Sequence, residues 1–144
     1  MAATLLFKQT MEQNRVSAKP SLLKEADVTV HERSIGGATI VDVSGRITVQ
    51  EGATEFRETI SRLLDGDRPR IIVNMLAVPY IDSTALGEMV RGYTSAARRG
   101  GGLKLLHVTA PVHQLLVLTR LADIFEAFGT EAEAVESFGP PSAP

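Results

Sequence analysis

The alternation of short apolar runs with helical periodicities predicts a domain of mixed strands and helices. Gly36-Gly37 separates two β-type runs, which is typical of a hairpin. Apolar residues recur at i, i+3, i+4, i+7 and i+11 from Leu86 to Ala97, which indicates a helix packed along one side. The expected order is strand 28–32, strand 38–43, helix 53–64, strand 71–73, helix 86–97, strand 103–108, helix 111–118, a short strand at 125–128 and helix 130–138.

This order predicts the fold class. Strand–helix–strand units of this length favour parallel pairing through right-handed crossovers, while the first two strands form an antiparallel hairpin. We therefore expect an α/β domain with a mixed sheet of four to five strands and about four helices over residues 26–138. Residues 1–25 are mixed and polar without a sustained period, and they are interpreted as a flexible N-terminal arm. The Pro-rich residues 139–144 are interpreted as a flexible tail.

Composition narrows the classes of function. The chain has 144 residues, of which 44% are hydrophobic and 22% charged, as is ordinary for one globular domain. It has no cysteine, which excludes disulfides, thiolate metal sites and cysteine nucleophiles. A net charge of −2 and 5% aromatic residues argue against direct nucleic-acid binding. No apolar run suits a signal peptide or a membrane span, so we expect a cytoplasmic protein that does not enter a membrane.

The most informative segment follows the strand at 71–73 and leads into the helix at 86–97. It reads Asp82-Ser83-Thr84-Ala85-Leu86-Gly87. Side chains of this kind cap helices by accepting hydrogen bonds from the free N–H groups of the first turn, and a cap alone would explain them. The same N–H groups and the positive end of the helix dipole also favour a phosphate, so Ser83 or Thr84 could carry one.

The segment resembles the signature of STAS domains of the anti-sigma-factor antagonist type, which carry an Asp-Ser-Ser/Thr-Gly-Leu-Gly motif after the third strand. The likeness extends to Val43-Ser44-Gly45-Arg46-Ile47 at a strand exit and to Arg98-Arg99-Gly100-Gly101-Gly102-Leu103 at a helix-to-strand turn. Residues 111–119, Leu121 and Phe125 are similar to the family's third helix and the segment after it. The resemblance covers about residues 28–138 and implies the STAS fold.

In that family, a serine kinase that doubles as an anti-sigma factor phosphorylates the serine after the aspartate. The unphosphorylated antagonist binds this kinase and frees the sigma factor, whereas the phosphorylated antagonist lets go. The resemblance implies that Ser83 is the phosphoacceptor, with Thr84 as the alternative, and that Asp82, Ala85, Leu86 and Gly87 are its neighbours. The implied partners are a serine-kinase anti-sigma factor and a phosphoserine phosphatase. It implies a binding protein rather than an enzyme, with no cofactor of its own.

Several positions depart from the family pattern around this site. Arg46 and Thr48 stand where the family often has acidic residues, and together with Tyr80 they are candidate partner contacts. Ala85 replaces a glycine, which suits a helix but adds a methyl group where a partner's backbone would have to pass.

Two further departures concern the scaffold. Asn74 replaces a frequent aspartate at the end of the third strand. Arg120 stands where a glycine is common after the third helix, so a left-handed cap at this residue would be strained.

Other chemistry has weaker support. His31, His107 and His113 form no metal-ligand motif, and no Gly-x-Ser-x-Gly elbow surrounds Ser83. The glycines at 100–102 follow a helix, which favours a helix cap over a phosphate loop. Two alternatives stay open: a scaffold or adaptor STAS protein of a stress-sensing or lipid-transport complex, and a nucleotide-binding or hydrolysing domain. The second would need a Walker-type loop that the chain lacks.

Overall fold

The computed structural model describes residues 28–140. The predicted arm, residues 1–25, and the last four residues of the predicted tail lie outside this range. The strands are β1 (Thr29–Ile35), β2 (Ala38–Ser44), β3 (Arg70–Ala77), β4 (Gly102–Leu106) and β5 (Ala127–Phe128). The helices are α3 (Ala53–Asp65), α4 (Ser83–Arg98), α5 (Ala110–Leu118) and α6 (Glu131–Glu136).

The strands form one sheet whose spatial order is the chain order, β1-β2-β3-β4-β5. β1 pairs antiparallel with β2, and the later neighbours all pair in parallel. The hairpin and the parallel crossovers predicted from the sequence are therefore confirmed. So is the mixed sheet, which has five strands and four helices within residues 28–140.

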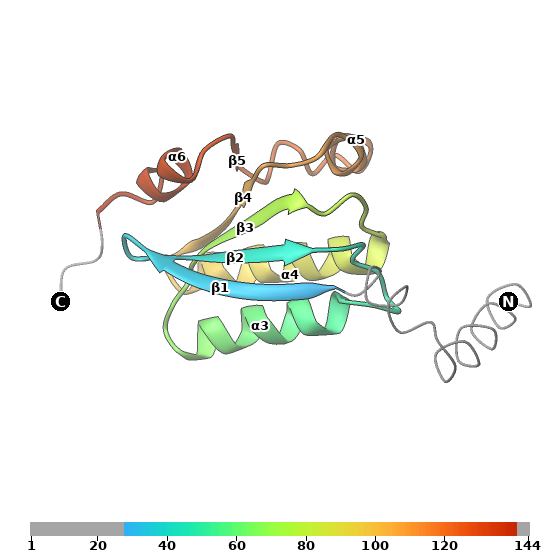
Figure 1. Ribbon diagram of the computed structural model, residues 1–144. Coiled ribbons are helices and arrows are strands. Elements are labelled where there is room, and N and C mark those ends of the chain that lie inside the picture. The colour runs from blue at the N-terminus through green and yellow to red at the C-terminus, as the bar shows by residue number, and fades with distance from the viewer. Residues whose placement is uncertain (1–27, 141–144) are drawn as a thin grey trace, which may run out of the picture.

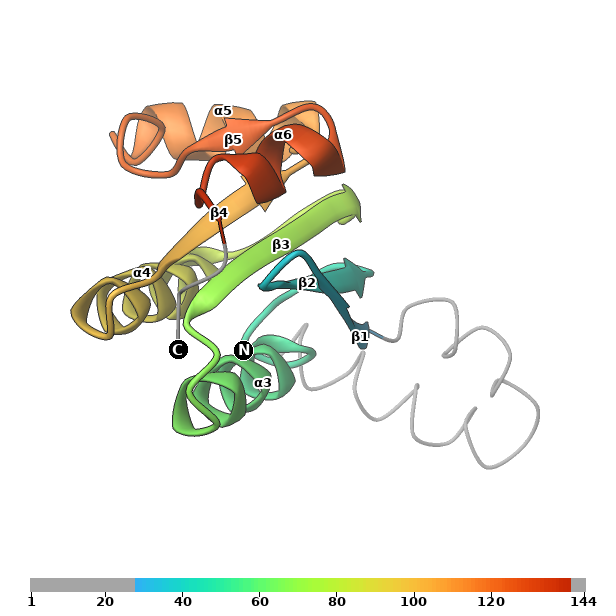
Figure 2. The same ribbon diagram turned by 90° about the vertical axis from the view of Figure 1, so that its left-hand side faces the viewer.

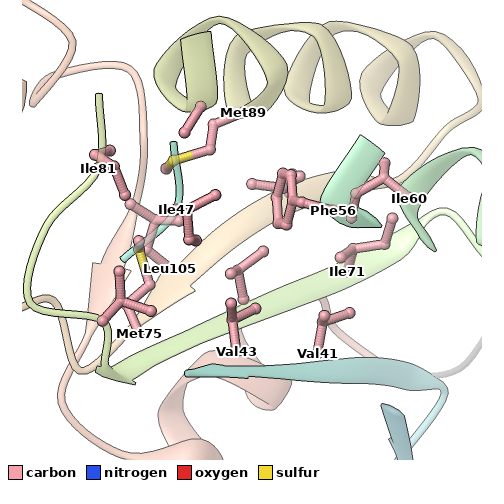
Figure 3. Packing of buried hydrophobic residues seen from close by; sticks show 14 of the residues in the cluster. Val41, Val43, Ile47, Phe56, Ile60, Ile71, Met75, Ile81, Met89 and Leu105 are labelled. Carbon is pink, nitrogen blue, oxygen red and sulfur yellow. The ribbon is translucent and has the colours of Figure 1, made fainter. Parts of the chain in front are cut away.

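Two layers of packing follow from the alternation of side chains along each strand. Helices α3 and α4 cover one face of the sheet, and α5 and α6 lie on the β4–β5 side of the molecule (Figures 1 and 2). Val41 and Val43 of β2 point toward α3 and α4, where they join Phe56 in the main core (Figure 3). Ala38 and Ile40 alternate with them and pack with Ala134 of α6 in a smaller core on the opposite face. Each large apolar side chain buried in this way contributes roughly 1.5–3 kcal/mol.

Gly92 lets α4 approach the sheet closely. A Cβ atom built on this residue would lie 2.9 Å from Leu103 Cδ1 and 3.2 Å from Ile60 Cγ2. Both distances are shorter than ordinary packing allows, so glycine at this position permits the close packing of α4 against α3 and β4.

Ion pairs fasten α6 to the sheet. The Arg33 guanidinium donates to Asp42 Oδ2 and to Glu131 Oε2, each at 2.6 Å. The hydrogen bond from Arg33 is the main cause that holds the pKa of Asp42 below its usual range, and a bond from the Asn74 amide adds to it. Because the folded state lowers the pKa of Asp42, the Arg33–Asp42 ion pair stabilises the protein at neutral pH. That contribution is lost as acid protonates Asp42.

Several boundaries differ from those expected. The strand expected at 103–108 ends at Leu106, because His107 adopts a left-handed φ of 56°. The strand expected at 71–73 runs on to Ala77, past the polar Asn74. The start of α4 at Ser83, directly after Asp82, agrees with the start expected from the polar segment, whereas its end extends by one residue beyond Ala97 to Arg98. The strand expected at 125–128 forms only at its last two residues, and α6 is shorter than the expected 130–138.

The cap after α5 confirms the strain expected at Arg120. Its φ is 64°, and the amide of Leu121 donates to the Leu116 carbonyl at 2.8 Å, which closes the left-handed turn that usually carries glycine. A side chain in this conformation costs on the order of 1 kcal/mol.

Replacing this residue is therefore expected to stabilise the domain. Arg120→Gly should raise the free energy of unfolding by about 0.5–1 kcal/mol, since glycine removes the steric strain but adds freedom to the unfolded chain. Urea denaturation followed by circular dichroism measures the change. Arg120→Ala is the control: it removes the guanidinium but keeps the Cβ atom, so it should stay near the parent. If Arg120→Ala gains as much stability over the parent as Arg120→Gly, the gain comes from removing the charge rather than from relieving the backbone.

Candidate functional site

Asp82 joins the start of α4 to a neighbouring loop. As the N-cap residue, it accepts a hydrogen bond at Oδ1 from the Ala85 amide at 2.9 Å. Its Oδ2 accepts from the Val49 amide at 2.8 Å, in the loop between β2 and α3. The cap predicted from the sequence is therefore present, and the same carboxylate also holds a segment that is 33 residues away in the chain.

The backbone reinforces this connection. The Ile47 amide donates to the Tyr80 carbonyl at 3.0 Å, and the Asp82 amide donates to the Ile47 carbonyl at 3.1 Å. Ile47 and Ile81 form a parallel bridge and are 2% and 1% exposed, so both side chains point into the core (Figure 3). The loop after β2 and the loop before α4 thus form one continuous edge at the carboxyl ends of the parallel strands.

The residues of the motif divide into an exposed and a buried set. Ser83 and Thr84 are exposed in the first turn of α4, and Gly87 is exposed one turn later. Ala85 and Leu86 are only 1% and 7% exposed and belong to the main core. The methyl group of Ala85 therefore faces the interior, and the expectation that it would stand in a partner's path is wrong.

The candidate partner contacts have different roles at this edge. The Arg46 guanidinium lies 4.7 Å from the centroid of the Tyr80 ring, and both residues are exposed. Thr48 is half-buried, and its hydroxyl accepts from the Glu51 amide at 3.2 Å. Thr48 therefore shapes the turn before α3, whereas Arg46 and Tyr80 present a cation and an aromatic ring to solvent.

Two exposed apolar residues at the same edge were missed in the sequence. Val49 is 63% exposed and Leu76 is 65% exposed. Val49 is an isolated apolar residue between polar neighbours, and Leu76 falls on the strand positions that alternate with the core-facing ones. Both signals can be read from the sequence, although only the fold shows that Val49 lies beside Asp82.

The glycines at 100–102, which could have suggested a phosphate loop, follow the end of a helix. Arg98 ends α4, Gly100 has a φ of +83°, and the Gly101 amide donates to the Ala96 carbonyl at 2.9 Å. This is a glycine C-cap, as interpreted from the sequence. Within residues 28–140, no three His, Asp or Glu side chains gather in a way that could hold a metal ion. Over the same residues, no helix has the length and apolar character needed to cross a bilayer.

Comparison with known proteins establishes the family. The model of the STAS domain matches residues 29–134, which is most of the chain, and the chain therefore belongs to the STAS domain family. A putative anti-sigma factor antagonist from Thermotoga maritima has a similar solved structure. Its TM-score is 0.71 at 24% identity, covering 76% of this chain and 93% of that one.

The anti-sigma factor antagonist SpoIIAA of Bacillus is also similar in both of its solved forms. The unphosphorylated form gives a TM-score of 0.66 at 17% identity, covering 76% of this chain and 95% of that one. The phosphorylated form gives 0.61 at 16% identity, covering 76% and 98%. At these identities the likeness is one of fold. A search of curated proteins finds no match.

Proposed function

We propose that this STAS domain is an anti-sigma factor antagonist, a protein-binding switch in which Ser83 is the phosphoacceptor. The observation that carries the proposal is the position of Ser83: it is exposed at the first residue of α4, directly after a capping Asp82. In the proposed reaction, a serine-kinase anti-sigma factor transfers the terminal phosphoryl group of ATP to the Ser83 hydroxyl. ADP and a proton are the other products, and a phosphoserine phosphatase reverses the modification by hydrolysis.

The exposed edge around Ser83 supports a protein partner. Val49, Leu76 and Tyr80 are 63%, 65% and 42% exposed. Gly87 leaves the surface of α4 flat, since a Cβ atom on it would contact nothing within 4 Å. Exposed apolar side chains beside a flat, polar helix turn are typical of a surface that a partner covers. In this proposal, the unphosphorylated edge binds the anti-sigma factor and thereby frees its sigma factor.

Phosphate labelling tests the assignment of Ser83. Incubation with the cognate kinase and ATP is expected to add one phosphate to the tryptic peptide 71–91, located by mass spectrometry. Ser83→Ala should abolish most of the labelling, and the matched variant Thr84→Ala should leave most of it, because only Ser83 follows Asp82 directly. Labelling that persists in Ser83→Ala would assign the acceptor elsewhere. Steady ATP hydrolysis by the protein alone that is lost in Ser83→Ala would indicate a catalytic serine instead.

A further inference from the structure

Arg46 is an exposed cation at the same edge of the molecule as the proposed phosphoacceptor. Its guanidinium is exposed and forms no ion pair with the described residues, in contrast to Arg33, which is paired with two carboxylates. Its contact is with the Tyr80 ring, 4.7 Å away. A cation over an exposed aromatic ring gains only about 0.5–1 kcal/mol. The Arg46 side chain can therefore leave the Tyr80 ring when a stronger interaction is available.

The backbone brings Arg46 to the same edge as Ser83. Arg46 immediately precedes Ile47, whose amide and carbonyl are bonded to Tyr80 and Asp82 respectively. Ser83 directly follows Asp82 in the chain. Since the side chains of Ile47 and Ile81 are buried together, their neighbours Arg46 and Tyr80 share the solvent side of this edge.

A phosphate on Ser83 would need such a cation. It would carry about −1.5 to −2 charges at pH 7, next to the Asp82 carboxylate. The Ala85 amide already donates to Asp82 Oδ1, so it is not free for the phosphate. Within the described residues, the amides of Ser83 and Thr84 remain as the open donors of the first turn. Two amides offset the repulsion from Asp82 only in part, whereas a guanidinium can bind a phosphate through two parallel hydrogen bonds.

We propose that Arg46 binds the phosphate of phosphorylated Ser83 and in doing so leaves the Tyr80 ring. This inference rests on the proposed function, because it assumes that Ser83 is modified. The new contact links the loop after β2 to the first turn of α4, alongside the existing bond between Asp82 and Val49. Phosphorylation then withdraws the Arg46 cation from the surface offered to a partner and uncovers the face of the Tyr80 ring that Arg46 contacts.

The test measures the second ionisation of the phosphate. Protein with phosphoserine placed at position 83 during translation, which requires no kinase, is titrated by phosphorus NMR at low salt. A bound guanidinium favours the dianion, so the pKa should lie below the value of about 6 that is usual for phosphoserine. Arg46→Gln should raise this pKa, lowering the ionisation constant about three- to tenfold, while Arg46→Lys should give an intermediate value because it keeps the charge but not the two-bond geometry.

The matched control is Arg91→Gln. Arg91 lies further along α4 and pairs with Glu88 at 3.5 Å, so its removal should leave the titration of the phosphate unchanged. Identical pKa values in the parent and in Arg46→Gln would overturn the role of Arg46 and leave Ser83 as the acceptor. Failure of a kinase to label Ser83 would count against the proposed function, but it would not alter this titration. The titration therefore tests the role of Arg46, and the kinase labelling tests the proposed function, independently of each other.

Discussion

Phosphorylation of Ser83 is expected to weaken binding to the proposed partner, an anti-sigma factor, about a hundredfold while the domain stays folded. At the interface, the added charge has to be desolvated and packed against groups arranged for a neutral hydroxyl, which costs several kcal/mol. A loss of about 3 kcal/mol corresponds to roughly two orders of magnitude in the dissociation constant. The effect is expected to be large because Ser83 is exposed at the proposed interface.

Within the domain, the same charge has a mildly favourable position. Ser83 is the first residue of α4, whose first turn has no acidic residue, and an anion there gains about 0.3–1 kcal/mol from the helix dipole. Repulsion from Asp82 opposes this gain. The melting temperature should therefore stay level or rise slightly, and the switch acts by loss of contact rather than by loss of structure.

Calorimetric titration and thermal melts of the two forms measure both halves of this expectation. Ser83→Ala treated with kinase and ATP is the control, because it passes through the same steps without acquiring the charge and should keep most of its affinity. Equal affinity of the phosphorylated and unmodified proteins would contradict the interface mechanism. A collapse of the melting temperature on phosphorylation would show instead that the switch acts by unfolding.

Asp82→Ala is expected to lower the free energy of unfolding by about 2 kcal/mol. The substitution removes the N-cap of α4, typically about 1 kcal/mol, and a second hydrogen bond to the Val49 amide of about 0.5–1.5 kcal/mol. For a domain of this size, the melting temperature should fall by roughly 4–10 °C. Scanning calorimetry measures the change.

Asp82→Asn is the matched variant for this prediction. The asparagine side chain keeps one oxygen that accepts a hydrogen bond, but its NH₂ group cannot accept the second. Its stability should therefore fall between those of the parent and Asp82→Ala. If Asp82→Asn is as unstable as Asp82→Ala, the charge of the carboxylate matters more than the two bonds. If Asp82→Ala is as stable as the parent, the link between the two loops is energetically unimportant.

Much of the fold could be predicted because the signals are local. The hairpin at Gly36-Gly37, the period of α4 and the glycine cap after Arg98 each depend on residues within one or two turns of one another. The boundaries were less accurate where one backbone angle decides them, as at His107, because a left-handed φ leaves no mark in the hydrophobic pattern. The strain at Arg120 was expected because the resemblance to the family indicated a glycine there.

The candidate site was predicted in part. The sequence indicated the motif and the cap at Asp82, but it could not show that the second oxygen of this carboxylate binds Val49. That bond joins segments that only the parallel pairing brings together. The burial of Ala85 was missed for a related reason: which side of the first helical turn faces the core depends on how α4 lies on the sheet, and the sequence does not specify that angle.

The agreement between strand order and chain order has a consequence for how this protein folds. Each strand from β2 onward pairs with the strand that precedes it in the chain, so its partner has always been synthesised when it emerges from the ribosome. The sheet can therefore grow in one direction during translation, and no strand has to wait with an open edge for a distant neighbour. The two loops that meet at Asp82 come from β2, β3 and the start of α4. All the residues of this edge are thus synthesised before β4, β5 and α6.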